Sequence, residues 1–128
     1  MTTQTLLNTI AKLQEQQFNI VKAKNADYAG NDAMRCFRAC EELGVTSLEQ
    51  GILVRMCDKL ARVCNLIGSD ASAAVHNESV GDTLSDLANY ANILQAHLLY
   101  RSGVVEDAEN QVPSDWSGAK PKRNSQEE

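Results

Sequence analysis

Residues 47–68 form the segment that most limits the fold. Ser47 is followed three residues later by Gln50, the capping-box pattern that opens a helix, and Gly68 is typical of a helix end. At about 100° per residue, one side of the segment is apolar and the opposite side is polar. The apolar side holds Leu53, Met56, Leu60, Val63, Cys64 and Ile67, and the polar side holds Arg55, Asp58, Lys59, Arg62 and Asn65. The pattern predicts an amphipathic helix over residues 48–67.

Three more segments show the helical period, at about 3–24, 33–43 and 78–100, and the last two are followed by Gly44 and Gly103. The polar stretches 25–32 and 68–77 are predicted to be turns or connections. The last helix should bury the stripe Val80, Leu84, Leu87, Ala91, Leu94 and Leu98. With only 5% aromatic residues, seven Gly and two Pro, the chain is predicted to be an all-α bundle of about four helices.

Charge and hydropathy narrow the class of protein. Residues 1–103, the predicted domain, carry nine Lys or Arg against eleven Asp or Glu, so a basic surface for duplex nucleic acid is missing. Apolar runs of the ~20 residues needed to cross a membrane are absent from the sequence. Residues 104–128 are polar, without a period, and are predicted to be a flexible tail in which Trp116 is a docking anchor. A cytoplasmic location is expected.

The four cysteines are predicted to be small core residues. Cys36 and Cys40 are four residues apart and Cys57 and Cys64 seven apart, within helical patterns and without a CxxC pair. Reduced, buried thiols are therefore expected rather than disulfides or a zinc site.

The last helix carries an acidic stripe. Glu78, Asp82 and Asp86 recur at every fourth position, and Ser85, Asn89 and Asn92 lie on the same side. Like charges at this spacing cost roughly 0.2–0.5 kcal/mol per pair, so a cation is expected to offset them. Carboxylates in this arrangement suit Mg²⁺ or Mn²⁺, which also take substrate phosphates as ligands. An ordinary solvent-exposed face, with Glu78 at the positive helix end, is the other explanation.

A polar stripe on one helix and a segment at the end of another would complete such a site. On the helix over 48–67, Arg55, Lys59 and Arg62 could bind phosphate oxygens, and Asp58 could add a carboxylate to the metal. The segment around Lys24, Asn25, Asp27 and Tyr28 could hold a base or sugar. Each also has a plain structural explanation: the stripe could be an exposed charged face, and the segment could be a turn.

These residues resemble a known family. Lys24-Asn-Ala-Asp-Tyr28, the run from Leu53 to Arg62, and the run from Asn77 to Tyr90 are similar to the pattern of the nucleotide-modification-associated branch of the all-α NTP pyrophosphatases. That superfamily includes MazG and the dimeric dUTPases, and this branch is common in phages. The resemblance spans about residues 5–100. Its most specific part is the set Glu78, Gly81, Asp82, Asp86, Asn89 and Tyr90.

The resemblance implies a MazG-like helical fold, a homodimer or homotetramer, and an activity dependent on Mg²⁺ or Mn²⁺. It implies cleavage of a (deoxy)nucleoside triphosphate between the α and β phosphates, and a narrower likeness points to dGTP. Implied roles are metal binding by Glu78, Asp82, Asp58 and Asp86, phosphate binding by Arg55, Lys59 and Arg62, and nucleoside binding by Lys24, Asn25, Asp27, Tyr28 and Asn89. Glu78, Asp82 and Lys59 would be the catalytic residues. The family's EExxE pattern is replaced here by Asp58, with Glu49 as a reserve ligand.

Two other functions remain open. A non-enzymatic helical adaptor would use the charged stripes as contact surfaces, and a deoxynucleotide N-glycosidase would release a free base instead of pyrophosphate. Helices with one apolar side are also expected to self-associate.

Overall fold

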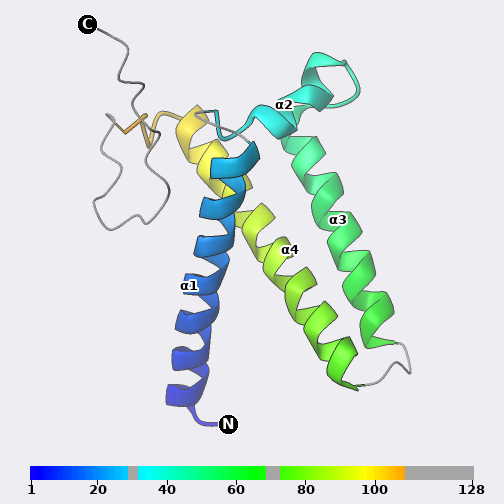
Figure 1. Cartoon of the computed structure of the whole chain (residues 1–128). Coiled ribbons are helices and arrows are strands. Elements are labelled where there is room, and N and C mark those ends of the chain that lie inside the picture. Colours follow the sequence, from blue (N-terminus) through cyan, green and yellow to red (C-terminus); the bar gives the residue numbers. More distant parts are fainter. Residues whose placement is uncertain (29–31, 69–72, 109–128) are drawn as a thin grey trace, which may run out of the picture.

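The computed structural model describes residues 1–28, 32–68 and 73–108, and for 26–28 and 73–78 it describes the backbone alone. This part of the chain forms four α-helices and no strand (Figure 1). They are α1 (Thr3–Tyr28), α2 (Arg35–Glu42), α3 (Leu48–Ile67) and α4 (Ala73–Arg101). The all-α prediction is therefore confirmed. Among the described helices, none is both long and apolar enough to cross a membrane.

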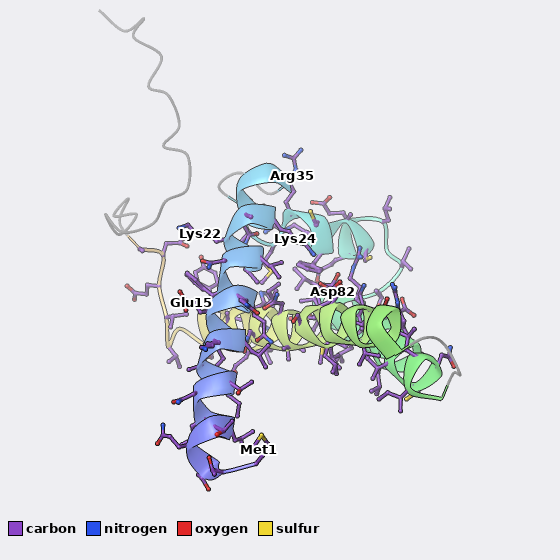
Figure 2. All side chains as sticks on the ribbon, turned by 60° about the horizontal axis from the view of Figure 1, so that its bottom comes forward. Met1, Glu15, Lys22, Lys24, Arg35 and Asp82 are labelled. Carbon is purple, nitrogen blue, oxygen red and sulfur yellow. The ribbon has the colours of Figure 1, made fainter. Side chains whose placement is uncertain are left out.

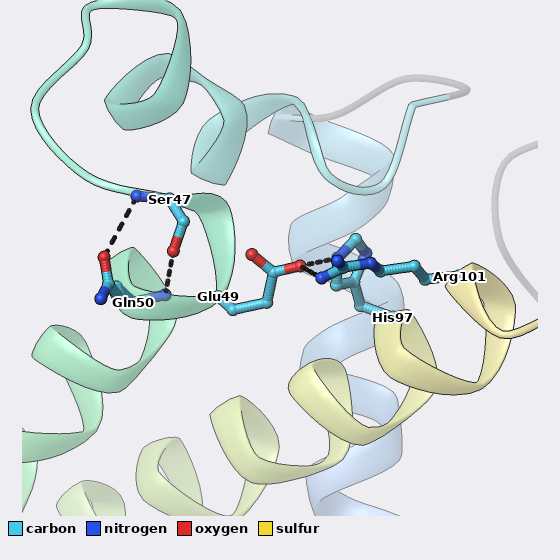
Figure 3. A network of polar contacts seen from close by, with 5 residues as sticks. All are labelled: Ser47, Glu49, Gln50, His97 and Arg101. Carbon is cyan, nitrogen blue, oxygen red and sulfur yellow. Dashed lines mark hydrogen bonds and ion pairs between the residues drawn. The ribbon is translucent and has the colours of Figure 1, made fainter.

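Helix α3 begins and ends as the sequence predicts. The Ser47 hydroxyl accepts a hydrogen bond from the backbone N–H of Gln50 at 3.2 Å, and the Gln50 side chain accepts one from the Ser47 N–H at 3.4 Å (Figure 3). The helix ends at Ile67, before Gly68. This capping box satisfies N–H groups that would otherwise lack a partner at the start of the helix.

Glycines in the left-handed region end two helices. Gly44 has a φ of 70° and Gly103 a φ of 77°. After α2, the N–H of Val45 donates to the carbonyl of Cys40 and that of Gly44 donates to Glu41, both at 3.0 Å. The same pair of bonds follows α4. Both ends are Schellman motifs, in which a glycine reverses the chain without strain.

Three helices have bounds that differ from the prediction. Helix α1 continues to Tyr28, through residues 25–28 that were expected to be a turn, and α4 starts at Ala73 rather than Glu78. Helix α2 spans Arg35–Glu42, slightly less than predicted. Asn and Asp disfavour a helix by well under about 1 kcal/mol each, which propagation of a helix already formed can outweigh. Two alanines begin α4, and alanine is the strongest helix former.

Helices α3 and α4 are antiparallel and form the centre of the fold, with α1 crossing α4 and α2 lying over the start of α3 (Figure 1). Gly51 of α3 lies against α2: a Cβ placed there would be in ordinary van der Waals contact, 3.7 Å, with the side chain of Cys40. Within the described residues, the buried apolar side chains are Leu48, Ile52 and Val63, and of these Ile52 is fully buried. The N-terminal half of α1 extends away from the other helices.

The predicted buried stripes are wrong in part. On α3, Leu53, Leu60, Cys64 and Ile67 are exposed, and the most buried residue is Ile52, which the predicted stripe omits. On α4, Leu84, Ala91 and Leu98 are exposed rather than buried. The apolar side of each helix is wide, and its neighbouring helices cover only part of it.

The prediction of buried cysteines is also wrong. All four thiols are free, as expected, but Cys36, Cys57 and Cys64 are exposed and Cys40 is half-buried. Residues 109–128, including Trp116, lie outside the described residues.

Candidate functional site

Three helices meet at the carboxylate of Asp86. Lys59 of α3 places its Nζ 3.0 Å from Asp86 Oδ2, and Lys24 of α1 places its Nζ 3.5 Å from Oδ1. Figure 2 shows Lys24 extending into the angle between α1 and α4, where Asp82 also lies. Asp86, one residue of the acidic stripe, therefore faces cations from two neighbouring helices, and the cluster formed by Lys24, Lys59 and Asp86 has a net charge of +1.

The environment of Asp86 favours its charged form. Partial burial raises the pKa of the carboxyl, but the hydrogen bond from Lys59 and the charges of Lys24 and Lys59 outweigh it, so the pKa lies below its ordinary value. Asp86 is thus an anion held between two ammonium groups. A bound polyanion would compete with it for those groups.

A cavity of about 310 Å³ lies beside this cluster, between α1 and α4. All of its lining side chains are uncharged, and five of them are carboxamides. The carboxamides are Gln14, Gln17, Asn25, Asn89 and Asn92, and the apolar lining includes Phe18, Val21, Met34 and Ile93. A cavity of this size, apolar with a few hydrogen-bonding groups, is typical of a small-molecule site.

Asn89 is the informative member of the lining. Its relative exposure is 7%, and its side chain has no hydrogen bond with any residue that the structure describes. A buried amide without a partner costs about 1–3 kcal/mol, so such groups are rare unless they have a function. The amide is placed to give hydrogen bonds to a ligand in the cavity.

The charged cluster and the cavity are contiguous. Asp86 and Asn89 are three residues apart on one side of α4, a rise of about 4.5 Å. On α1, Lys24 belongs to the cluster and the next residue, Asn25, lines the cavity. The site therefore has a cationic end and an uncharged, hydrogen-bonding end.

Three residues of the predicted phosphate and metal stripe on α3 do not join Asp86. Asp58 is exposed and, in the described part of the chain, has no ion pair, so it does not pair with Arg62. Since neighbouring helix positions are ~100° apart, Asp58 turns away from the side where Lys59 contacts α4. Arg55 lies over the ring of Phe37 of α2, 5.8 Å from its centroid, and Arg62 is exposed.

Glu49, the reserve ligand, belongs to a different network. Arg101 donates a hydrogen bond of 2.7 Å to Glu49 Oε1, and His97 Nε2 lies 3.1 Å from the same oxygen (Figure 3). The hydrogen bond from its own backbone N–H lowers the pKa of Glu49, and those from His97 and Arg101 add to this. Glu49 precedes Lys59 by ten residues, ~15 Å along α3. It ties the start of α3 to the end of α4.

Of the remaining predicted site residues, the structure describes the side chain of Asp82 but not those of Glu78, Asp27 and Tyr28. Asp82 is exposed, lies four residues before Asp86, and has no ion pair among the described residues. Glu78, Asp27 and Tyr28 have helical backbones, but their side chains lie outside the described residues. In the described part, no three His, Cys, Asp or Glu side chains form a group placed to hold a metal ion.

Sequence reasoning missed much of the cavity. It selected Asn25 and Asn89 as site residues and placed Asn92 on the same side of its helix, but it missed Gln14 and Gln17. The spacing of Gln14, Gln17 and Asn25 with Phe18 and Val21 is itself a signal, since these five positions share one side of a helix. Carboxamides along an apolar helix side are unusual in a plain core.

Comparisons with known proteins add no relative: no protein-family model, curated protein or solved structure matches this chain.

Proposed function

We propose that the chain is a nucleoside triphosphate pyrophosphohydrolase dependent on Mg²⁺ or Mn²⁺ that acts as a homo-oligomer. It would cleave a (deoxy)nucleoside triphosphate between the α and β phosphates and release the monophosphate and pyrophosphate. The observation that carries the proposal is the contiguity of a lysine-rich cluster and an uncharged carboxamide cavity along one side of α4. The resemblance of the sequence to the all-α NTP pyrophosphatases gives the reaction.

The two ends of the site suit the two ends of a nucleotide. A nucleobase is flat, uncharged at neutral pH, and rich in hydrogen-bond donors and acceptors. The carboxamides of Asn25, Asn89 and Asn92 offer both kinds of group. Phosphates are anions, for which the ammonium groups of Lys24 and Lys59 are suitable partners.

The donor set on α4 suits a hard divalent cation. Mg²⁺ is usually held by one or two carboxylates together with substrate phosphates, rather than by a complete protein cage. Asp82 and Asp86 are carboxylates one helical turn apart, and Asp82 has no ion pair among the described residues. Glu78, a further turn earlier, is the third proposed ligand. The cation would polarise the phosphate oxygens and supply a water of lowered pKa.

The protein side chains have complementary tasks. Lys59 and Lys24 exchange the Asp86 carboxylate for phosphate oxygens, which leaves Asp86 available to the cation. Their charges then stabilise the negative charge on the departing pyrophosphate. Asn25 and Asn89 hold the base, and so fix the α phosphate relative to the carboxylates.

Product analysis tests this proposal. The purified chain is incubated with each of the eight common NTPs and dNTPs and Mn²⁺, and the products are separated. dGTP is the first substrate to examine, because the narrower resemblance points to it. A monophosphate with pyrophosphate is the expected result.

Other outcomes would overturn the proposal. Release of a free base would indicate the N-glycosidase. No turnover, together with no thermal stabilisation by Mn²⁺ and any of the nucleotides, would favour the adaptor, because a ligand that binds the folded state raises its apparent stability.

A further inference from the structure

The polar lining of the cavity between α1 and α4 has no partner in the part of the chain that the structure describes. None of its five carboxamide side chains makes a hydrogen bond there, and Asn89 is only 7% exposed. The cavity also presents an apolar surface that includes Phe18 and Val21. It therefore suits an occupant that combines a flat apolar ring with a hydrogen-bonding group.

The end of α4 leads the chain toward the side of this cavity. Gly103 reverses the chain in the left-handed conformation, and the Tyr100 hydroxyl donates a hydrogen bond of 3.2 Å to Asp107 Oδ2. In both views, residues 104–108 lie on the side of the fold where α1 crosses α4, away from α3 (Figures 1 and 2). The residues that follow, 109–128, therefore start next to the two helices that line the cavity.

The cavity is within reach of this continuation of the chain. Ala96, one of the lining residues, comes five residues before Arg101, the last residue of α4, which corresponds to a rise of about 7.5 Å. Trp116 is the eighth residue after Ala108, so the two can lie up to ~26 Å apart. This reach exceeds the ~10 Å diameter of a helix, so the segment can also pass around α1.

Trp116 is the only tryptophan of the chain, and it has the chemistry that the cavity suits. An indole is flat and apolar, with one N–H that finds a hydrogen-bond acceptor when the ring is buried. The carbonyl oxygen of the Asn89 side chain is such an acceptor, and Phe18 offers a ring to pack against. With two fused rings, an indole also resembles a purine base in shape.

Asp115 adds charge complementarity. Lys24 of the charged cluster and Asn25 of the cavity are consecutive in α1. Asp115 and Trp116 are consecutive in the same way, so a carboxylate and an indole can lie at the two ends of the site together. The cluster at Asp86 has a net charge of +1, which the carboxylate of Asp115 would neutralise.

We propose that residues 109–128 dock onto this site, with the Trp116 ring in the cavity and the Asp115 carboxylate at the lysines. A weak contact is sufficient, because a short linker gives an effective concentration on the order of 1 mM, at which a contact with a Kd of about 0.1 mM is closed about 90% of the time. The docked segment holds the places that the proposed function gives to a base and a phosphate. A nucleotide then has to displace it, so the site is closed until substrate is present.

The first test uses Trp116 as its own probe and needs no turnover. Selectively excited, the indole of the unaltered chain should emit at shorter wavelength than indole in water, and acrylamide should quench it severalfold less. Ala96→Phe places a ring in the cavity and should raise the quenching toward that of free indole. Ala91→Phe is the matched control, since Ala91 is exposed on the same helix and does not line the cavity. A fully quenchable indole in the unaltered chain, or equal effects of the two variants, would overturn the docking.

A second test changes only the docking segment, so it does not depend on how the helices tolerate a substitution. Asp115→Lys would place a third cation at the lysine cluster, and it should make Trp116 as quenchable as free indole. Glu109→Lys is the control, since it makes the same change of charge seven residues before Trp116, and it should leave the indole protected. Protection that survives Asp115→Lys, or is lost equally in both variants, would contradict the contact with the lysines.

The closing of the site rests on the proposed function and is tested separately. If the docked fraction is about 90%, Trp116→Ala should lower the KM for the best substrate about tenfold, because the apparent affinity is reduced by the fraction of open sites. The kcat should stay the same. An unchanged or higher KM would overturn the competition between segment and nucleotide. A chain that hydrolyses no nucleotide would contradict the proposed function, whereas the quenching of Trp116 would still decide whether the segment docks.

Discussion

In an ordinary helical domain polar side chains are exposed and leucines are buried. The two flanks of the α3–α4 pair show the reverse. On the flank that faces α1, polar groups are partly or fully covered: Asp86 lies between two lysines and Asn89 is 7% exposed. On the other flank, Leu60 and Leu84 are exposed. Burying the unpartnered amide of Asn89 and exposing leucines both cost free energy.

The two flanks of this helix pair would meet different requirements. A polar flank that is covered without full hydrogen bonding is preorganised for a ligand, because the groups that will bind it are already removed from water. An apolar flank that is exposed becomes stabilising once another surface covers it. The same pair of helices would then serve a ligand on one side and assembly on the other.

The largest expected effect is on turnover and concerns the polar flank. Asp82→Asn keeps the shape of the side chain but removes the charge that would hold the divalent cation. Turnover of the best substrate should fall at least about 100-fold, which corresponds to roughly 3 kcal/mol of lost transition-state stabilisation. Steady-state assays with Mn²⁺ measure it. Glu15→Gln, an exposed carboxylate change on α1, is the control and should keep full activity.

The next prediction compares the stability lost when a buried and an exposed apolar side chain of α3 are each changed to alanine. Ile52→Ala should lower the free energy of unfolding by about 2–5 kcal/mol at any protein concentration, because Ile52 is fully buried within the chain. Leu60→Ala should destabilise by less, because Leu60 is 53% exposed within the chain. If a second copy covers Leu60 in the proposed oligomer, the loss should fall on dilution. Urea unfolding at two protein concentrations separates them. A concentration-independent loss for Leu60→Ala would show that the flanks do not differ in this way.

Sequence reasoning succeeds where local chemistry decides the structure. The bounds of α3 follow from Ser47, Gln50 and Gly68, whose effects depend on neighbours within four residues. Gly44 and Gly103 end their helices for the same reason. The extension of α1 to Tyr28 was missed because helix propagation outweighs the weak preference of Asn25 and Asp27 for turns.

The candidate site depends on relations that a single helix does not contain. The apolar side of α3 is wide enough to include both Ile52 and Leu60, and the position of α4 selects which of them is buried. The sequence places Asp58 and Lys59 on the same polar side of α3, and only the rotation of α3 against α4 brings Lys59 rather than Asp58 to Asp86. Gln14 and Asn92 share a cavity only because α1 crosses α4 at that level.

A smaller effect is expected at the buried amide. Asn89→Leu replaces an unpartnered carboxamide by an apolar side chain of similar shape. The free energy of unfolding without ligand should rise by about 1 kcal/mol, because a desolvated polar group is removed. The KM for the best substrate should increase about tenfold or more. A gain in stability together with a higher KM would distinguish a ligand-binding amide from a structural one, and a loss of stability would contradict this role.

The smallest expected effect is the pH dependence of the Asp86 cluster. Because the folded-state pKa of Asp86 is lowered, its carboxylate contributes stability above its ordinary pKa of about 3.9, and this contribution is lost as the pH falls through the lowered value. The cluster is partly exposed to solvent, which limits the contribution to about 1 kcal/mol or less. Asp86→Asn should therefore be less stable than the unaltered chain at pH 7, and the difference should shrink below about pH 4. Parallel urea titrations from pH 7 to pH 3 measure it, and the lowered pKa values of Asp32 and Glu49 cancel because both proteins contain them. A difference that stays constant with pH would mean that the carboxylate charge does not hold α1 and α3 against α4.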